Sequence, residues 1–376
     1  MKIGIDARMY RQSGIGRYIR NLIANLQLID QENQYYIFLQ KEDFDSLKLA
    51  GNFHPVLADF PWYGFAEQLK FPPLLKKYQL DVVHFPHFNV PIFYSGQYIV
   101  TIHDLIHQHF QLKEATIHNY LTYQIKKIGF EKIFLKALSK SDKIITPSNF
   151  VKEQLINEWR VKRDKIMVTY EGVEGGFLKL LDELSEKDFL KLSAKFGFKK
   201  PYLFYVGNAY PHKNIHQLIK AFTILKNDWS GLNLVLSGPE SHFYKFLKQS
   251  TKIKEVIFTG PVSDRELVVL YKNARAYVFP SLEEGFGIPL LEAMASGCPV
   301  VCSKAGSLPE VGGEAAFYFD PQDTEDMVLK IKRVLTDEKL RKELIRKGER
   351  RYKLFDWSKM AKQTLDIYKE VTDLND

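Results

Sequence analysis

The chain has 376 residues, more than one compact hydrophobic core holds, and this length predicts two domains of ordinary size. Hydrophobic residues make up 45% and charged residues 26%, which are values of a globular protein and exclude extensive disorder. The net charge is +8, no run of about 18 apolar residues predicts a membrane-spanning helix, and the charged start MKIGIDARMYR is not expected of a signal peptide.

Short β-branched runs alternate with longer amphipathic stretches along the chain, a pattern typical of βαβ units and parallel sheets. In the first half, strands are expected at residues 2–6, 35–39, 82–85, 98–101, 143–146 and 166–170. In the second half, they are expected at residues 202–206, 232–237, 256–259, 276–279, 300–303 and 316–319. We therefore predict an α/β fold of two Rossmann-like doubly wound domains, which face a central cleft at the carboxyl ends of their strands.

A glycine-rich turn that contains Gly14 and Gly16 follows the first strand and opens a helix. It resembles the dinucleotide fingerprint G-x-G-x-x-G, but the third position is Ile19, which argues against an oxidoreductase. Strand 98–101 is followed by His103 and Asp104, at a sheet edge where polar side chains face the cleft. No histidine has metal-ligand spacing backed by carboxylates and no Asp-x-Asp motif follows a strand, so we predict no metal site.

The second half has further junctions of strand, loop and helix. The loop after strand 202–206 runs from Gly207 to Lys213, which places a lysine at a helix start. Gly238 and Val262 lie in the loops after the next two strands. The most informative junction is residues 277–303, where Pro289 suits the first turn of a helix and Gly297 suits its end.

This last junction presents backbone N–H groups and the positive end of a helix dipole to a bound anion. Glu284 lies in its loop, and Glu292 lies about one turn inside its helix. Carboxylates would repel a bare phosphate, but they suit a ligand that carries hydroxyls beside its phosphates. The junction therefore indicates a nucleotide-sugar site.

The two glutamates resemble the Glu-x7-Glu signature of retaining glycosyltransferases of the GT-B fold, especially glycosyltransferase family 4 and its bacterial mannosyltransferases. The resemblance implies that Glu284 contacts the transferred sugar, that Glu292 holds the donor ribose, and that backbone N–H groups of residues 285–290 surround the diphosphate. The implied donor-binding residues are Gly14, Gly16, Asn208, Lys213, Gly238, Val262, Glu284, Gly285, Phe286, Gly287, Ile288, Leu290 and Glu292.

The resemblance also implies catalytic residues, which are His103 near the transferred sugar, Glu284, and Lys213 against the diphosphate. Tyr18 and Asp104 are expected to contact the acceptor. Many relatives have an arginine where this chain has Asn208. Lys213 is therefore expected to neutralise the diphosphate largely alone, together with the N-terminal ends of the helices, or a basic residue from elsewhere compensates for the missing arginine.

From the strand pattern and the resemblance together we predict an N-terminal acceptor-binding domain at residues 1–172, completed by a C-terminal helix at 357–376. A connector at 173–200 leads to a donor-binding domain at 201–356. The predicted enzyme is a retaining, metal-independent hexosyltransferase without a cofactor. It transfers a hexose, with mannose from GDP-mannose favoured, to a hydroxyl of a glycan or lipid-linked saccharide in surface polysaccharide synthesis. The alternatives are a UDP-sugar-dependent transferase, a nucleotide-sugar epimerase of GT-B fold and a non-catalytic sugar-nucleotide-binding partner subunit.

Cysteine content and charge predict the location. Cys298 and Cys302, the only cysteines, are expected to be buried thiols of a cytoplasmic protein. Residues 121–165 hold eleven Lys and Arg against five Asp and Glu, a surplus of six, and no nucleic-acid-binding motif accompanies them. With the aromatic residues there (Tyr120, Tyr123, Phe130 and Phe134), or with residues 62–65 ahead of Lys70, Lys76 and Lys77, they predict peripheral binding to an anionic membrane. A solvated basic face is the alternative.

Overall fold

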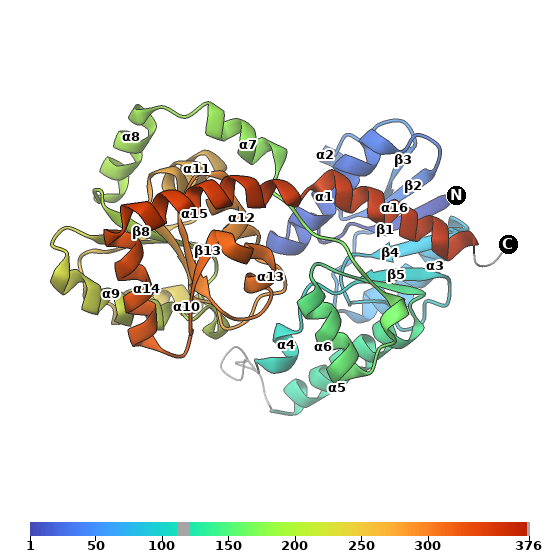
Figure 1. Ribbon diagram of the computed structural model, residues 1–376. Helices are drawn as coiled ribbons and strands as arrows, with labels where there is room; N and C mark the ends of the chain where they lie inside the picture. Colours follow the sequence, from blue (N-terminus) through green and yellow to red (C-terminus); the bar gives the residue numbers. More distant parts are fainter. Residues whose placement is uncertain (111–119, 374–376) are drawn as a thin grey trace. The chain divides into compact units, whose positions relative to one another are not determined.

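The computed structural model describes residues 1–110 and 120–373, which form two compact units (Figure 1). Unit 1 consists of Met1–Glu171 and Trp357–Asp376, and unit 2 of Gly172–Asp356. Each unit is a parallel sheet with helices on both faces, so the predicted α/β fold of two Rossmann-like domains is confirmed. Among the described residues, no helix is long and apolar enough to cross a membrane.

Unit 1 has a parallel sheet of seven strands in the order β3-β2-β1-β4-β5-β6-β7. The strands are β1 (Lys2–Asp6), β2 (Gln34–Leu39), β3 (Phe53–Leu57), β4 (Val82–Phe85), β5 (Tyr98–Thr101), β6 (Lys143–Thr146) and β7 (Ile166–Val168). Its helices are α1 (Ser13–Ile29), α2 (Lys41–Ser46), α3 (Phe65–Lys77), α4 (Ile106–His109), α5 (Tyr120–Lys140), α6 (Asn149–Trp159) and α16 (Trp357–Asp373). The strand order reverses between β1 and β4, and this switch point opens a crevice at their carboxyl ends.

The two faces of this sheet are covered by different helices. Phe71 of α3, Phe134 of α5 and Val151 of α6 belong to one buried cluster with strand residues such as Phe85, so these helices share a face. Helix α1 packs against α16, the last helix of the chain, beside β4 (Figure 1). The C-terminal segment thus belongs to the first sheet.

Unit 2 has a parallel sheet of six strands in the order β10-β9-β8-β11-β12-β13. The strands are β8 (Tyr202–Val206), β9 (Asn233–Ser237), β10 (Val256–Gly260), β11 (Ala276–Phe279), β12 (Val300–Ser303) and β13 (Ala316–Phe319). Its helices are α7 (Gly175–Asp182), α8 (Glu186–Phe196), α9 (Ile215–Asp228), α10 (His242–Ser250), α11 (Asp264–Asn273), α12 (Ile288–Ala295), α13 (Leu308–Gly312), α14 (Thr324–Thr336) and α15 (Glu338–Arg351). The switch point lies between β8 and β11, which precede the Lys213 and Glu284 loops.

Every strand expected from the sequence is present within two residues of its expected ends, and the described residues contain one further strand that was not predicted. This strand, β3, contains Pro55, which pairs with Ile37 of β2. Proline removes a backbone donor, and it is tolerated here because β3 is the edge strand of its sheet.

Two details differ from the expectations. Residues 173–200 form α7 and α8, which pack against α11, so this segment is part of unit 2. Two of the four aromatic side chains expected to serve a membrane surface do not: Phe134 is buried in the core of unit 1, and Phe130 packs against that core. The side chains of Tyr120 and Tyr123 lie outside the described residues. Cys298 and Cys302 are buried free thiols, as predicted.

Candidate functional site

Lys213 and Glu284 form an ion pair at the switch point of unit 2. Lys213 ends a short 3-10 helix (Pro211–Lys213) after β8, and Glu284 lies in the loop after β11. Lys213 Nζ is 2.7 Å from Glu284 Oε1, and the two side chains are 14% and 10% exposed. Because β8 and β11 are neighbouring parallel strands, their following loops meet at one edge of the sheet although the pair is 71 residues apart in sequence.

Backbone contacts hold these two loops together. The Leu282 N–H donates to the carbonyl of His212 over 2.7 Å. The side-chain amide of Asn214, the residue after Lys213, donates to the carbonyls of Pro280 at 3.2 Å and Pro321 at 2.9 Å. Asn214 has φ 57°, a left-handed conformation that asparagine adopts more readily than most residues. The ammonium and the carboxylate are therefore positioned by backbone contacts rather than by their own attraction alone.

Gly306 and Ser307 support the Glu284 loop from the segment after β12. The Ser307 hydroxyl lies 3.0 Å from the carbonyl of Glu284 and 2.8 Å from that of Phe286, and the Ser307 N–H donates to the Glu284 carbonyl at 3.2 Å. A Cβ at Gly306 would approach the Glu284 nitrogen to 2.7 Å, and Gly306 has φ 59°. Only glycine fits such a close approach, so these two residues fix the loop; the sequence interpretation missed both.

Glu292 lies inside α12 and is 3% exposed. The Tyr271 hydroxyl of α11 donates to Glu292 Oε2 over 3.1 Å. The helix begins after Gly287, which has φ 104°, and Pro289 occupies its first turn as expected. The other predicted donor residues of this junction are Gly285, Phe286, Ile288 and Leu290, of which Phe286, Ile288 and Leu290 have buried side chains.

The remaining predicted donor residues of unit 2 lie in the loops after β8, β9 and β10. A Cβ at Gly238 would come within 2.0 Å of the Gly207 carbonyl, so glycine is required where the first two loops cross. Asn208 is engaged with its own loop, because its Oδ1 accepts from the Tyr210 N–H at 3.3 Å. Val262 is half-buried just ahead of α11. These loops and the Glu284 junction thus line the same edge of the sheet.

In unit 1, His103 follows β5 and is held through both ring nitrogens. Nε2 lies 3.0 Å from the carbonyl of Pro86, and Nδ1 lies 3.4 Å from Glu171 Oε1. The Pro86 carbonyl can only accept, so Nε2 carries a proton in this arrangement. The ring of Tyr18 packs edge-on against His103 with centroids 4.9 Å apart. Glu171 was not predicted, because nothing in its local sequence marks it.

A buried hydrogen-bond chain extends behind His103. His84 Nδ1 lies 2.6 Å from the Tyr368 hydroxyl, and His84 Nε2 lies 2.8 Å from Thr101 Oγ1. The Thr101 hydroxyl donates in turn to the Tyr18 hydroxyl at 3.2 Å. Since threonine has one proton to give, His84 Nε2 donates to Thr101 and Nδ1 accepts from Tyr368. Burial lowers the pKa of His84 to about 3, so the chain holds a neutral imidazole.

Tyr18 lies inside unit 1 and is 1% exposed. Its placement suits orientation of the His103 ring better than the direct acceptor contact expected from the sequence. Asp104 is half-exposed, and its Oδ1 accepts from the Ile106 N–H at 3.0 Å. Gly14 has open space around it in the first turn of α1, whereas a Cβ at Gly16 would come within 2.4 Å of the Tyr10 carbonyl.

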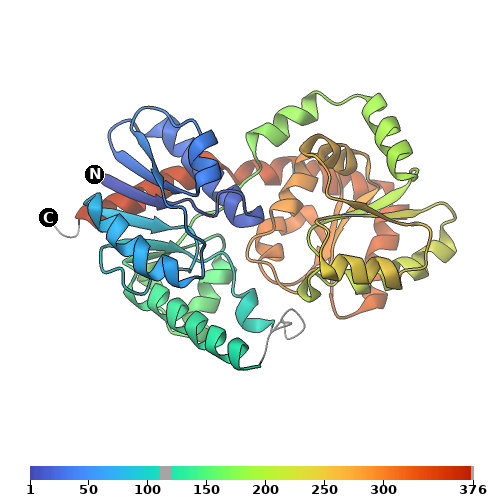
Figure 2. The same cartoon turned by 180° about the vertical axis from the view of Figure 1, so that it is seen from behind.

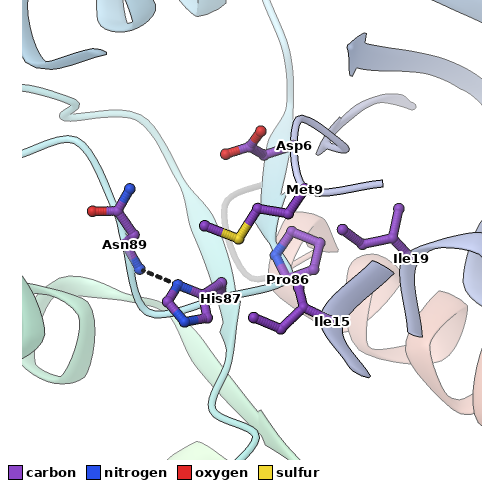
Figure 3. Close-up of a pocket in the computed structure, with 7 residues that line it drawn as sticks. All are labelled: Asp6, Met9, Ile15, Ile19, Pro86, His87 and Asn89. Atoms are coloured by element: carbon purple, nitrogen blue, oxygen red, sulfur yellow. Dashed lines mark hydrogen bonds between the residues drawn. The ribbon is translucent and has the colours of Figure 1, made fainter. Parts of the chain in front are cut away.

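A hollow lies at the switch point of unit 1, at the carboxyl ends of β1 and β4 (Figure 3). Asp6, His87 and Asn89 supply its polar lining, and the apolar lining is Met9, Ile15, Ile19 and Pro86. Figure 3 shows these side chains arranged around it, with Asp6 on one side and Ile15 on the other. The hollow has room for about one water molecule, which is too little for a sugar ring.

Buried charges fix the Asp6 carboxylate. Arg8, which is 2% exposed, donates to Asp6 through Nε at 2.8 Å and Nη2 at 2.7 Å, and Nη2 also reaches Glu67 at 2.6 Å. The Asn89 amide donates to both oxygens of Glu67 at 2.8 Å. Such networks add little to stability compared with apolar packing, so we interpret this one as a positioning device for Asp6. The described residues contain no cluster of three or more potential metal ligands.

Comparison with known proteins gives two family matches. The family described as "Glycosyltransferase Family 4" matches residues 12–174, and the family described as "Glycosyl transferases group 1" matches residues 188–351. O-antigen chain mannosyltransferase B of Escherichia coli is 27% identical over 96% of this chain and 97% of its own length. O-antigen chain mannosyltransferase RfbU of Salmonella typhimurium is 30% identical over 73% of this chain and 70% of its own length.

Solved structures agree with the fold. The Anabaena protein HepE, solved in complex with UDP-glucose, superposes with a TM-score of 0.75 at 17% identity, covering 98% of this chain and all of that one. At this identity the likeness concerns the fold, which is that of the GT-B glycosyltransferases.

Proposed function

We propose a specific reaction from the premise that the chain belongs to glycosyltransferase family 4 and has the GT-B fold. It is a glycosyltransferase of polysaccharide synthesis. The finer proposal is that it transfers mannose from GDP-mannose, with retention of anomeric configuration, to a hydroxyl of a growing or lipid-linked glycan. The full-length likeness to an O-antigen mannosyltransferase supports mannose as the sugar.

The observation that carries this proposal is the Lys213–Glu284 ion pair at the switch point of unit 2. Without a ligand, the lysine is neutralised by the carboxylate. We infer that the donor diphosphate competes for the ammonium and releases the Glu284 carboxylate toward the hydroxyls of the sugar. Glu292, steadied by Tyr271, is proposed to hold the ribose.

Lys213 also supports the proposal of metal-independent transfer. A fixed ammonium beside the leaving diphosphate stabilises the charge that develops there, the electrostatic task that a divalent metal performs in other enzymes. The neighbouring start of α12 adds the positive end of its dipole. Asn208 carries no charge, and its side chain is engaged with its own loop, so we assign the cationic role to Lys213.

We assign acceptor binding to unit 1. His103, oriented by Glu171 and Tyr18, offers a rigid imidazole after β5, and Asp6, fixed by Arg8, offers a carboxylate at the end of β1 that can accept from an acceptor hydroxyl. We further propose that the enzyme works in the cytoplasm at the inner face of a membrane, where lipid-linked acceptors lie.

One experiment tests the reaction. Purified protein is incubated with GDP-mannose or UDP-glucose, with and without EDTA, and release of nucleoside diphosphate is measured with Lys213→Ala as the control. Turnover of GDP-mannose that persists in EDTA and falls in Lys213→Ala supports the proposal. Turnover of UDP-glucose alone would change the donor, and activity that EDTA abolishes and Mn²⁺ restores would refute metal independence. Retention is tested with a saccharide acceptor added, and the anomeric configuration of the new glycosidic bond, determined by NMR, decides it.

A further inference from the structure

Unit 1 exposes a group of large apolar side chains on α3, α5 and the segment between β4 and β5. Phe65 is 90%, Leu69 67% and Phe93 65% exposed. Three further members are less exposed: Ile92 at 37%, and Ile128 and Leu135 at 52% each. We call these six residues the α3–α5 surface. Soluble proteins expose scattered apolar residues, but a contiguous group of this kind marks an interaction site.

Helical spacing and hydrogen bonds place the six side chains on adjoining segments. On α3, Phe65 and Leu69 are four residues apart and share a face, while Phe71 and Leu75 point into the core. On α5, Ile128 and Leu135 are seven apart and share a face, about 100° around the helix from the buried Phe134.

The segment that carries Ile92 and Phe93 lies between the two helices. The Ile92 N–H donates to Gln68 Oε1 of α3 at 2.6 Å. Lys136 Nζ of α5 donates to the carbonyls of Pro91 at 3.1 Å, Tyr94 at 2.6 Å and Ile92. Figure 2 shows α3, in light blue, and α5, in blue-green, on the same side of the sheet of unit 1.

The α3–α5 surface is cationic. Exposed lysines stand on the same helical faces as its apolar members: Lys76 lies eleven residues after Phe65, and Lys132 lies between Ile128 and Leu135. Further exposed lysines at its margin are Lys70, Lys77 and Lys140. The acids in residues 65–77 and 128–140 are Glu67, which is buried against Arg8, and Glu131, which is half-buried. The lysines therefore have almost no acidic counterpart on these faces.

We propose that the α3–α5 surface docks unit 1 on an anionic lipid bilayer, with Phe65, Leu69 and Phe93 inserted at the headgroup level and the lysines against lipid phosphates. Aromatic and aliphatic side chains with a basic rim are the combination that such an interface selects. A second copy of the chain is a poor occupant, because it would bring two cationic faces together. The proposal deepens the proposed function by giving the enzyme a place beside lipid-linked acceptors.

The test is co-sedimentation of the full-length protein with phosphatidylcholine vesicles that contain or lack phosphatidylglycerol. Binding to the anionic vesicles only, reversed by salt, is expected. Phe65→Ser should weaken binding about tenfold or more, because a buried Phe contributes about 1.5–3 kcal/mol, and Lys76→Gln about fivefold, from about 1 kcal/mol per basic residue.

Two matched controls are Phe246→Ser and Leu329→Ser, which replace exposed residues of unit 2 that are 63% and 60% accessible and should leave binding unchanged. Equal binding to both vesicle types, or no effect of Phe65→Ser, would overturn the proposal. So would a dimer that Phe65→Ser dissociates while vesicles stay unbound. Hydrolysis of GDP-mannose in solution is measured in parallel. If the proposed reaction is wrong, this hydrolysis is absent while vesicle binding remains. If the docking proposal is wrong, hydrolysis remains while vesicle binding is absent, so the two failures are distinguishable.

Discussion

The candidate residues of the two units are positioned in different ways. In unit 2, Glu284 and Glu292 lie in one continuous segment, and Lys213 comes from the neighbouring strand. In unit 1, His103 depends on Pro86, Glu171 and Tyr18, which are far from it in sequence. A site built from one junction of strand, loop and helix can be predicted from a short sequence motif. A site assembled from residues that are scattered along the sequence cannot be predicted in this way.

The electrostatics of the two units differ as well. The Lys213–Glu284 pair is charged and partly exposed, so an anionic ligand can replace one partner of the lysine. The chain from Tyr368 through His84 and Thr101 to Tyr18 is buried and neutral, and no ligand can enter it without unpacking the core. We infer that ligand binding rearranges contacts in unit 2 and meets a fixed surface in unit 1.

The largest expected effect comes from breaking the charged pair. Lys213→Ala and Glu284→Ala should each lower kcat by about 30- to 1000-fold, because each removes about 2–4 kcal/mol of preorganised transition-state stabilisation. Steady-state kinetics with the donor identified by the screen measure both.

The double variant tests whether the two residues act as a unit. A combined loss close to that of one single variant supports coupling through the pair. Losses that add fully would show that the ion pair in the ligand-free protein has no bearing on catalysis.

The second prediction concerns the backbone support of the Glu284 loop. Gly306→Ala should lower kcat about a hundredfold with the protein still folded, because a new Cβ displaces the Glu284 backbone and misplacement of about 1 Å costs on this order. Gly231→Ala is the matched control. Gly231 has φ 88° but no atom within 4 Å of the new Cβ, so it should cost about 1–2 kcal/mol of stability and no activity. Equal activity losses in both variants would mean that strain, and not the Glu284 contact, is responsible.

The Gly306 contact is also an example of a feature that the local sequence does not predict. Most strands and the Glu284 junction follow from local rules: β-branched runs, the glycines of a loop and a proline in a first turn. The switch points depend on the strand order, which was not predicted from the sequence. Gly306 and Ser307 were not predicted as site residues, because their role depends on a loop that lies 21 to 23 residues away in sequence. Strand β3 was not predicted because it contains Pro55, which argues against a strand unless that strand lies at an edge. Edge position is a property of the whole sheet and cannot be inferred from the local sequence.

In unit 1 the gap between sequence and structure is larger. Asp6 and Arg8 precede the glycine turn and resemble an ordinary strand end in the sequence. Their arrangement depends on the buried Glu67, which accepts from Arg8 and lies 59 residues away. Tyr18 was expected to contact an acceptor, but it is buried where α1 packs on α16, and the position of α16 depends on the whole chain. Local patterns predict which residues reach a sheet edge, and long-range packing decides which of them stay exposed.

The third prediction separates the two glutamates of unit 2. Glu292→Ala should raise the donor KM about 10- to 100-fold with a smaller change in kcat, because a ribose contact worth about 1.5–3 kcal/mol persists from ground state to transition state. Tyr271→Phe, which leaves the carboxylate in place, should raise KM less. A Glu292 variant that loses kcat at unchanged KM would exchange the roles assigned to the two glutamates.

The smallest expected effect concerns the neutral chain of unit 1, through its pH dependence. Burial lowers the pKa of His84 to about 3, while an unfolded histidine titrates near 6.5. Between these values the unfolded state binds the extra proton, so the stability contributed by the neutral imidazole is complete above about pH 6.5 and falls as the pH drops toward about 3. At about 1.4 kcal/mol per pH unit, moving from pH 7 to pH 5 should lower the free energy of unfolding by about 2 kcal/mol through this group.

His84→Gln isolates that contribution from the other titrating groups. The amide can accept from Tyr368 and donate to Thr101, as the neutral imidazole does, but it does not titrate in this range. The variant should be less stable than the wild type at pH 7, and the difference should shrink at pH 5. Of the four tryptophans, Trp62, Trp159 and Trp357 belong to unit 1 and Trp229 to unit 2, so fluorescence during urea unfolding reports mainly on unit 1. A difference that stays constant with pH would mean that His84 accepts a proton inside the fold, and the buried chain would then not be the fixed, neutral counterpart of the Lys213–Glu284 pair.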